Sequence, residues 1–273
     1  MVTRLSIPLS LAAFTLAACA SGPPAENTAP AEIRTEFVTY KAGDTDCKGY
    51  LAWDANRKGP RPGVLVVHEW WGHNDYAQRR ARMLAELGYT ALALDMYGDG
   101  KSTEHPTEAG AFMKATLADL PAAVERFEAA RALLETHPTT DAAQTAAIGY
   151  CFGGGIVLGM ARMGMDLDAV CSFHGSLATD SPATAGAVKA EVFVAHGEAD
   201  AMVSAGDVAA LKDEMAASGA AFEFHSYPYA RHGFTNPAAD QKAKDYGIPI
   251  GYSPVADAAS WQQMQAFLAR VFE

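Results

Sequence analysis

One cysteine stands in a pattern that could make it a nucleophile. The segment Gly149-Tyr150-Cys151-Phe152-Gly153-Gly154-Gly155 lies between a short apolar run and a stretch of helical pattern. A sharp strand–nucleophile–helix turn needs small residues two positions before and after the nucleophile, and Gly149 and Gly153 meet that need. At a helix start, Cys151 would gain thiolate character, and the Phe152 N–H would point at a developing oxyanion. The alternative is a glycine-rich turn around a structural cysteine.

An acid and a histidine follow Cys151 in the chain order typical of such a turn. Asp200 comes just after the apolar run 192–196, and His232 follows a run that ends at residue 227. In this order the acid would orient the imidazole, and His232 would act as general base and acid. The simpler alternatives are an Asx turn at Asp200 and a surface position for His232. Together the three residues predict covalent catalysis by a cysteine.

The elements that must position these residues alternate along the chain. We expect strands at 35–40, 48–53, 63–67, 89–94, 145–148, 169–173, 192–196 and 222–227, and helices at 75–87, 106–116, 119–135, 152–163, 204–218 and 256–271. The first two strands should form an antiparallel edge, and the rest predict a mostly parallel sheet with helices on both faces. Such α/β sheets carry their sites at the carboxyl ends of strands. His68, His174 and His196 end predicted strands and should line or underlie that cleft.

With these residues assembled, the sequence resembles the dienelactone hydrolase family. The resemblance covers most of residues 36–273 and is carried by the segments 68–72, 149–154, 197–200 and 231–234. It implies an α/β-hydrolase fold that cleaves carboxylic esters or lactones with the triad named above and no cofactor. It also implies that Glu69 takes the thiol proton when substrate binds, and that the Trp70 N–H is the second oxyanion donor. From the residues alone, Glu69 could instead cap the helix that begins near Asp75.

The substrate side departs from that family. Dienelactone hydrolases hold a substrate carboxylate with two arginines, but segment 95–99 contains none and Asn236 stands at the second position. We therefore expect an uncharged substrate in an aromatic pocket, with Trp71, Tyr97, Phe234 and Asn236 as further candidate pocket residues. Two alternatives stay open. One is a non-catalytic envelope protein that binds a hydrophobic ligand on the same fold, and the other is an acyltransferase that uses the same triad.

The N-terminal segment predicts export. Residues 1–18 have the pattern of a signal peptide, with a short apolar stretch after Arg4. Residues 16–19 look like a bacterial lipobox, so Cys19 is expected to be lipidated, followed by a flexible tether to residue 35 and a single domain over 36–273. The protein should then lie in the periplasm or cell envelope and meet the membrane only through its lipid. An ordinary signal peptide is the alternative.

Composition excludes other classes of function. The chain has 273 residues and a formal net charge of −11, which disfavours nucleic acid as a partner. The segment 68–73 is superficially similar to a zinc-protease motif, but its second histidine is one position too far and it follows a strand, so no metal is expected. Cys47 and Cys171 are interpreted as small apolar residues, with a disulfide between them as the alternative.

Overall fold

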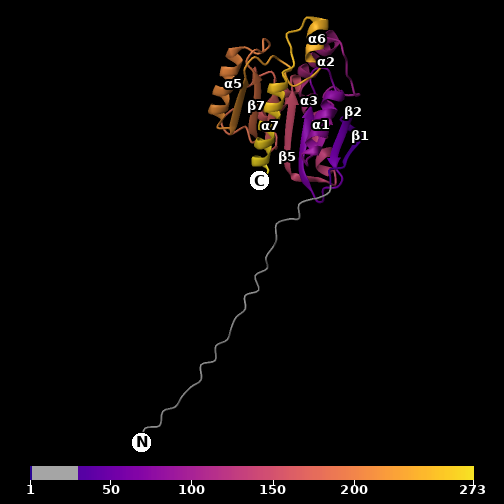
Figure 1. Ribbon diagram of the computed structural model, residues 1–273, viewed down its shortest axis with the longest axis vertical. Helices are drawn as coiled ribbons and strands as arrows, with labels where there is room; N and C mark the ends of the chain where they lie inside the picture. Colours follow the sequence, from indigo (N-terminus) through magenta and orange to yellow (C-terminus); the bar gives the residue numbers. More distant parts are fainter. Residues whose placement is uncertain (2–29) are drawn as a thin grey trace.

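The computed structural model describes residue 1 and residues 30–273. The strands of this part form one eight-stranded sheet (Figure 1). The strands are β1 (Ile33–Ala42), β2 (Thr45–Asp54), β3 (Arg61–Val67), β4 (Thr90–Leu94), β5 (Thr140–Tyr150), β6 (Ala169–Phe173), β7 (Glu191–Gly197) and β8 (Phe222–Tyr227). Their spatial order is β1-β2-β4-β3-β5-β6-β7-β8. The β1–β2 and β2–β4 pairs are antiparallel and all other pairs are parallel, so the predicted antiparallel edge is confirmed.

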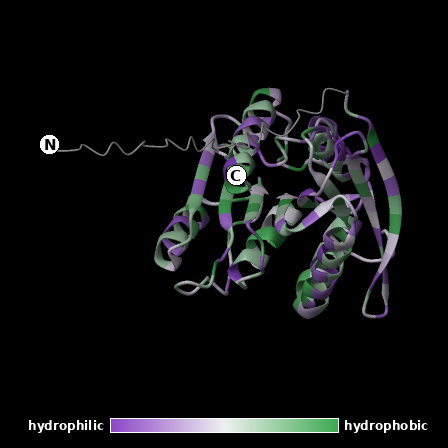
Figure 2. Cartoon of the chain, turned by 90° about the horizontal axis from the view of Figure 1, so that it is seen from below, coloured by the Kyte–Doolittle hydropathy of each residue, from purple (hydrophilic) through white to green (hydrophobic). Residues whose placement is uncertain are grey.

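Helices cover both faces of this sheet. They are α1 (Asp75–Glu86), α2 (Pro106–Ala118), α3 (Leu120–Thr136), α4 (Phe152–Arg162), α5 (Ala205–Ser218), α6 (Ala239–Tyr246) and α7 (Pro254–Val271). Apolar side chains of α1 and α7 pack on one face, and those of α3, α4 and α5 pack on the other. Figure 2 shows the helices with both hydrophobic and hydrophilic residues, as expected for helices that lie between a core and solvent. The α/β prediction is therefore confirmed.

The central strands owe their position to unbroken apolar sequence. Residues 64–67 of β3 have no exposed surface, with Leu65 and Val67 packed on the α3/α4 side and Val64 and Val66 on the α1/α7 side. Strands covered on both faces must be apolar at every position, which is the pattern seen here. The parallel register sets Val67 of β3 beside Gly149 of β5, so the carboxyl ends of the central strands form one edge.

Two strand starts and one helix differ most from the predicted elements. Strand β1 begins at Ile33, before the predicted domain start at residue 36, because the Glu32 N–H is already bonded to the Asp54 carboxylate at 2.9 Å. Strand β5 begins at Thr140, before the predicted start at residue 145. Its first residues pair with β3 on the far side of a register shift between Pro62 and Gly63, which the alanine-rich sequence of β5 does not predict. Helix α6 lies between the predicted elements 222–227 and 256–271, where no helix is predicted, and no side chain caps its start.

The predicted signal peptide, Cys19 and most of the tether lie outside the described residues. In the part of the chain that is described, no helix combines the length and apolar character needed to cross a bilayer. Cys47 and Cys171 are free, buried and packed on opposite faces of the sheet. The alternative of a disulfide between them is therefore wrong, and both act as apolar core residues.

Candidate active site

The predicted nucleophile occupies a strained turn between β5 and α4. Cys151 has φ +54° and ψ −115°, a conformation that non-glycine residues avoid unless the surroundings enforce it. A Cβ atom at Gly149 would lie 2.1 Å from the Gly153 carbonyl oxygen, and one at Gly153 would lie 2.4 Å from the Val67 carbonyl oxygen. Both contacts are impossible, so the two glycines are needed for strand and helix to meet at this angle.

The structure brings Cys151, His232 and Asp200 together. His232 Nε2 lies 3.0 Å from Cys151 Sγ, and His232 Nδ1 lies 2.8 Å from Asp200 Oδ2. Because Asp200 is a carboxylate, Nδ1–H donates to it, and Nε2 is left to face the sulfur. The backbone holds the ring in place, since the His232 carbonyl accepts from the Gly251 N–H at 3.0 Å. The arrangement has the geometry of a nucleophile, a base and an orienting acid.

Electrostatics at His232 favour the charged ring. Burial by itself would lower the pKa of His232, but the Cys151 sulfur and the Asp200 carboxylate raise it to about 10. The ring is almost fully buried, so water screens these charges weakly. At neutral pH an imidazolium beside the sulfur stabilises the thiolate, which is the reactive form of cysteine.

Glu69 lies in the same buried region, in the loop after β3. Its Oε2 accepts a hydrogen bond of 2.6 Å from Asn236 Nδ2, and Asn236 Oδ1 accepts from the Ala238 N–H at 2.9 Å, which fixes the amide orientation. Burial raises the pKa of Glu69 to about 7, although the Asn236 bond and the charge of His232 act in the opposite direction. The alternative that Glu69 caps α1 is wrong, because Asn74 accepts from the Tyr76 N–H and is the cap.

Substituting Glu69 with glutamine is expected to stabilise the protein at high pH. A buried acid whose pKa is raised on folding contributes stability below its unfolded pKa and loses it as pH rises through about 7. With about 1.4 kcal/mol per pKa unit, ionisation of Glu69 costs on the order of 3 kcal/mol. Urea unfolding should therefore show Glu69→Gln above the wild type by an amount of that order at pH 8.5, and much less at pH 5. The same change at the exposed Glu86 is the control, and a pH-independent difference for Glu69→Gln would refute the argument.

The two predicted oxyanion donors, the N–H groups of Phe152 and Trp70, lie at the start of α4 and in the loop after β3. Phe152 is the first residue of α4, so its N–H is one of those that a helix leaves without an internal partner. The Glu69 carbonyl and the Trp70 N–H belong to the same peptide group. This carbonyl is hydrogen-bonded to His68 Nδ1 at 2.6 Å. His68 Nε2 accepts from the Met96 N–H at 3.2 Å, so Nδ1 carries the proton and donates. Burial lowers the pKa of His68 to about 4, and this neutral ring fixes the orientation of the peptide.

Of the predicted pocket residues, Tyr97 lies beside the nucleophile, whereas Phe234 and Trp71 are enclosed by other parts of the protein. Tyr97 donates its hydroxyl to the Trp70 carbonyl at 3.0 Å and packs against Phe152, so it belongs to the wall beside the nucleophile. Phe234 has no exposed surface and packs with the core on the α1/α7 face, so its prediction as a pocket residue is wrong. Trp71 is 2% exposed and lies under the Lys242 ammonium group, 4.0 Å from its ring centre, which leaves little of it for a substrate.

Asp95 organises the segment 95–99, where the resemblance to dienelactone hydrolases implies an arginine. Asp95 is fully buried, and its two oxygens accept four backbone N–H groups, from Lys48, Tyr97, Gly98 and Gly100, at 2.7 to 3.1 Å. These bonds shape the loop that carries Tyr97. The acid at this position therefore has a structural role.

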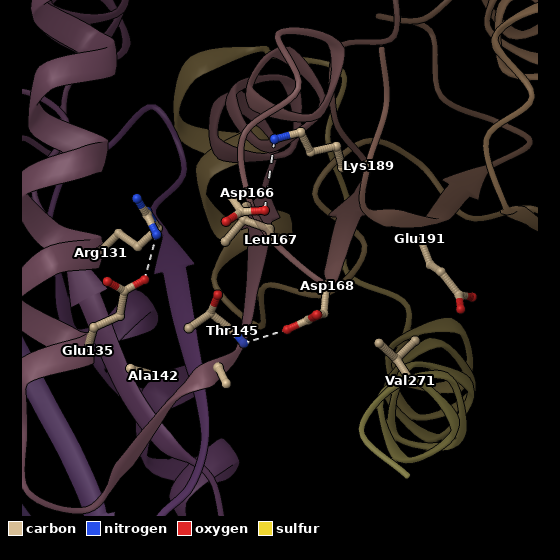
Figure 3. Close-up of a pocket in the computed structure, with 11 residues that line it drawn as sticks. Arg131, Glu135, Ala142, Thr145, Asp166, Leu167, Asp168, Lys189, Glu191 and Val271 are labelled. Atoms are coloured by element: carbon tan, nitrogen blue, oxygen red, sulfur yellow. Dashed lines mark hydrogen bonds and ion pairs between the residues drawn. The ribbon is translucent and has the colours of Figure 1, made fainter. Parts of the chain in front are cut away.

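A separate hollow of about 420 Å³ opens at the other end of the sheet (Figure 3). Its lining includes Asp168, which accepts from the Thr145 N–H at 2.8 Å, and Lys189, which lies 3.9 Å from Asp166. The lining residues come from α3, β5, the end of α7 and the residues at the amino ends of β6 and β7, and they include no cysteine or histidine. Within residues 30–273, no group of three or more histidine, cysteine or acidic side chains is arranged to hold a metal ion.

The histidines that end β3 and β6 lie where the sequence predicts. His68 and His174 are fully buried beneath the site. Thr235 was not predicted as a site residue, yet it bonds to His174 at 2.7 Å. The sequence feature that could have identified Thr235 is its position three residues after His232.

Comparison with known proteins agrees with this geometry. Residues 47–272 match the dienelactone hydrolase family. A Methylorubrum extorquens protein named a carboxymethylenebutenolidase is 29% identical over 76% of this chain and 71% of its own length. The solved structure named m3DLH superposes with a TM-score of 0.82 at 36% identity, covering 88% of this chain and 99% of that one. A dienelactone hydrolase-like promiscuous phosphotriesterase from metagenomic libraries gives 0.81 at 35% identity with the same coverage. The chain therefore belongs to the dienelactone hydrolase family, and it is a carboxylic ester or lactone hydrolase.

Proposed function

We propose that the chain hydrolyses uncharged esters or lactones through a thioester on Cys151. The observation that carries the proposal is the 3.0 Å contact between His232 Nε2 and Cys151 Sγ, with Asp200 2.8 Å behind the ring. The elbow at Cys151 and its place at a helix start support the same role.

The reaction divides into two steps. The Cys151 thiolate attacks the carbonyl carbon, and the electron pair of the C=O bond moves to the oxygen, which faces the N–H groups of Phe152 and Trp70. The C–O bond then breaks, and the His232 imidazolium gives its proton to the leaving alcohol. In the second step His232 takes a proton from water, the hydroxide adds to the thioester, and the C–S bond breaks to restore the thiolate.

Glu69 supplies a place for a proton in the buried region around His232. With its pKa raised by burial to about 7, the carboxyl group exists in both forms at neutral pH. A group in that condition can accept the thiol proton when substrate displaces it from Asn236, and this is the role we propose. Together with the imidazolium, it would leave Cys151 as the thiolate that attacks the substrate.

The substrate we propose is uncharged. The residue four positions after His232 is the neutral Asn236, which is occupied by Glu69. Of the buried cations in this region, Lys242 pairs with Glu104 and lies over Trp71, and Arg80 pairs with Asp257. A substrate carboxylate would thus approach Glu69 where the described lysine and arginine side chains are already paired, at a cost in binding free energy.

Matched substrates test this choice directly. A neutral methyl ester and the corresponding free acid, joined to the same activated aryl ester, differ only in charge. We expect the full-length chain to hydrolyse the neutral member with a kcat/KM at least about tenfold higher, which corresponds to 1.4 kcal/mol. A preference for the anionic member would overturn the uncharged-substrate proposal. An aryl phosphotriester belongs in the same panel, because it is uncharged and a 35% identical structure is named a promiscuous phosphotriesterase.

Two other uses of the site are distinguished by products. An acyltransferase would convert added alcohols into new esters faster than water forms the acid. A non-catalytic binding protein would release no alcohol from any member of an ester and lactone panel while remaining folded. Product analysis of one panel therefore separates hydrolysis from both.

A further inference from the structure

We infer that His174 is a positioning residue that ties the nucleophile to the loop of His232. This inference rests on the proposed function, because it concerns how the two reacting groups are held together. His174 follows β6 directly, is fully buried, and has φ +40°, a second strained backbone conformation next to the elbow. A strained backbone persists only where the surrounding structure enforces it, and such positions cluster at functional sites.

The two ring nitrogens of His174 contact the two halves of the site. Nδ1 lies 3.1 Å from the backbone nitrogen of Cys151, and Nε2 lies 2.7 Å from Thr235 Oγ1. The Cys151 N–H is a donor, which it shares between Nδ1 and the Phe173 carbonyl at 3.0 Å, so Nδ1 carries no proton. Nε2 then carries the proton and donates to Thr235. One neutral ring therefore joins the nucleophile's backbone to a residue three positions after His232.

The neutral state of this ring is maintained by its surroundings. Burial lowers the pKa of His174 well below its ordinary value, and the nearby charges of His232 and Arg80 lower it further. The rings of His174 and His232 have centroids 5.4 Å apart. A second cation at that distance would oppose the imidazolium at His232, so a neutral His174 supports the charged state that the sulfur requires.

Thr235 is held from its other side by a buried polar chain. Its Oγ1 lies 2.5 Å from the Tyr76 hydroxyl, which accepts from Arg80 Nε at 3.2 Å. Arg80 Nη2 donates to the Thr235 carbonyl at 2.8 Å and to Asp257 at 2.6 Å. The chain is thereby anchored in α1 and α7. His174 is the link between this anchored loop and the elbow.

The consequence concerns the distance between sulfur and imidazole. If the link is removed, the His232 loop keeps its Arg80 contacts but loses its connection to the Cys151 backbone. Small displacements of reacting groups reduce rates strongly, by up to about a hundredfold for 1 Å. Loss of the link should therefore lower kcat and the reactivity of the sulfur at low pH, with little change in KM.

The test uses the full-length chain and two ways to cut the same link. His174→Phe removes both ring nitrogens, and Thr235→Val removes only the hydroxyl that accepts from His174. Thr235→Ser restores a hydroxyl at that position. Tyr150→Phe is the matched control, because the Tyr150 ring lies beside His174 and its buried hydroxyl has no hydrogen-bond partner among the described residues. Thermal unfolding identifies any variant that fails to fold.

Two readouts are followed for each folded variant. The first is kcat and KM on an activated aryl ester. The second is the rate at which iodoacetamide alkylates Cys151, measured by the mass of its peptide at pH 6 and pH 9. Alkylation forms an S–C bond and releases iodide without using the ester pocket, so it reports on the thiolate even if no ester is hydrolysed.

We expect Thr235→Val and His174→Phe to lower kcat by about tenfold or more, with KM changed by less than about threefold. The ratio of alkylation rates, pH 6 over pH 9, should fall by about fivefold or more, while Thr235→Ser and Tyr150→Phe stay near the wild type. If Thr235→Val leaves kcat and the alkylation ratio unchanged, the inference is wrong. If the wild type is silent on esters but the alkylation ratio falls in the variants, the positioning role stands and the proposed hydrolysis fails.

Discussion

Substituting Cys151 with alanine is expected to lower kcat/KM on an activated aryl ester by at least about a thousandfold. The sulfur is the only atom of the site that forms a bond to the substrate in the proposed reaction, and loss of a nucleophile typically removes most of an enzyme's rate enhancement. Release of the aryl alcohol, followed by absorbance with the full-length chain, measures this directly. Alanine fits the elbow, because the backbone strain at φ +54° exists with cysteine already.

Cys47→Ala is the matched control for this experiment. Cys47 is buried in β2 and free, on the strand next to the edge of the sheet, so its loss removes a thiol without touching the site. It should leave kcat/KM within about threefold of the wild type. Retention of a tenth or more of wild-type activity by Cys151→Ala would show that another group attacks the ester.

Substituting Asp200 with asparagine is expected to lower kcat by about a thousandfold to ten thousandfold. Asp200 accepts from His232 Nδ1–H at 2.8 Å, and this bond leaves Nε2 facing the sulfur. An amide can donate to Nδ1, which would place the proton on Nε2 and remove the base from Cys151. The carboxylate is also one of the two groups that raise the pKa of His232, so the imidazolium would lose support.

Pre-steady-state kinetics test whether Asp200→Asn weakens the imidazolium–thiolate pair. If the imidazolium–thiolate pair is weakened, the first release of aryl alcohol should slow together with steady-state turnover. Asp213→Asn, the same change at an exposed position of α5, should leave both rates unchanged. A normal kcat in folded Asp200→Asn would contradict the assignment of Asp200 as the orienting acid.

Much of the site follows from short-range sequence pattern. The glycines on either side of Cys151 are dictated by contacts to backbone atoms within two neighbouring strands and one helix, so the local sequence suffices to predict the elbow. The order of Cys151, Asp200 and His232 follows from the strands that precede them, because parallel strands place their carboxyl ends at one edge. These features depend on backbone geometry that every sequence of this fold must satisfy.

The remainder depends on contacts between distant segments, which no local pattern encodes. Phe234 is two residues from His232 but turns into the core, and Asn236 turns toward Glu69, 167 positions earlier in the chain. Helix α6 has eight residues of mixed polarity, and its place is set by contacts such as the Lys242–Glu104 pair. The link between His174 and Thr235 joins two loops after different strands, so only the assembled structure reveals it.

The most direct test of the central claim is the mass of the protein during the first turnover. The full-length chain would be mixed with an activated acyl ester, quenched in acid within milliseconds, and digested to locate any added mass. The account predicts one acyl group per chain on the peptide that contains Cys151, with a burst of alcohol of matching size, and neither in Cys151→Ala. Steady hydrolysis by the wild type without an acyl group on that peptide would contradict nucleophilic attack by Cys151.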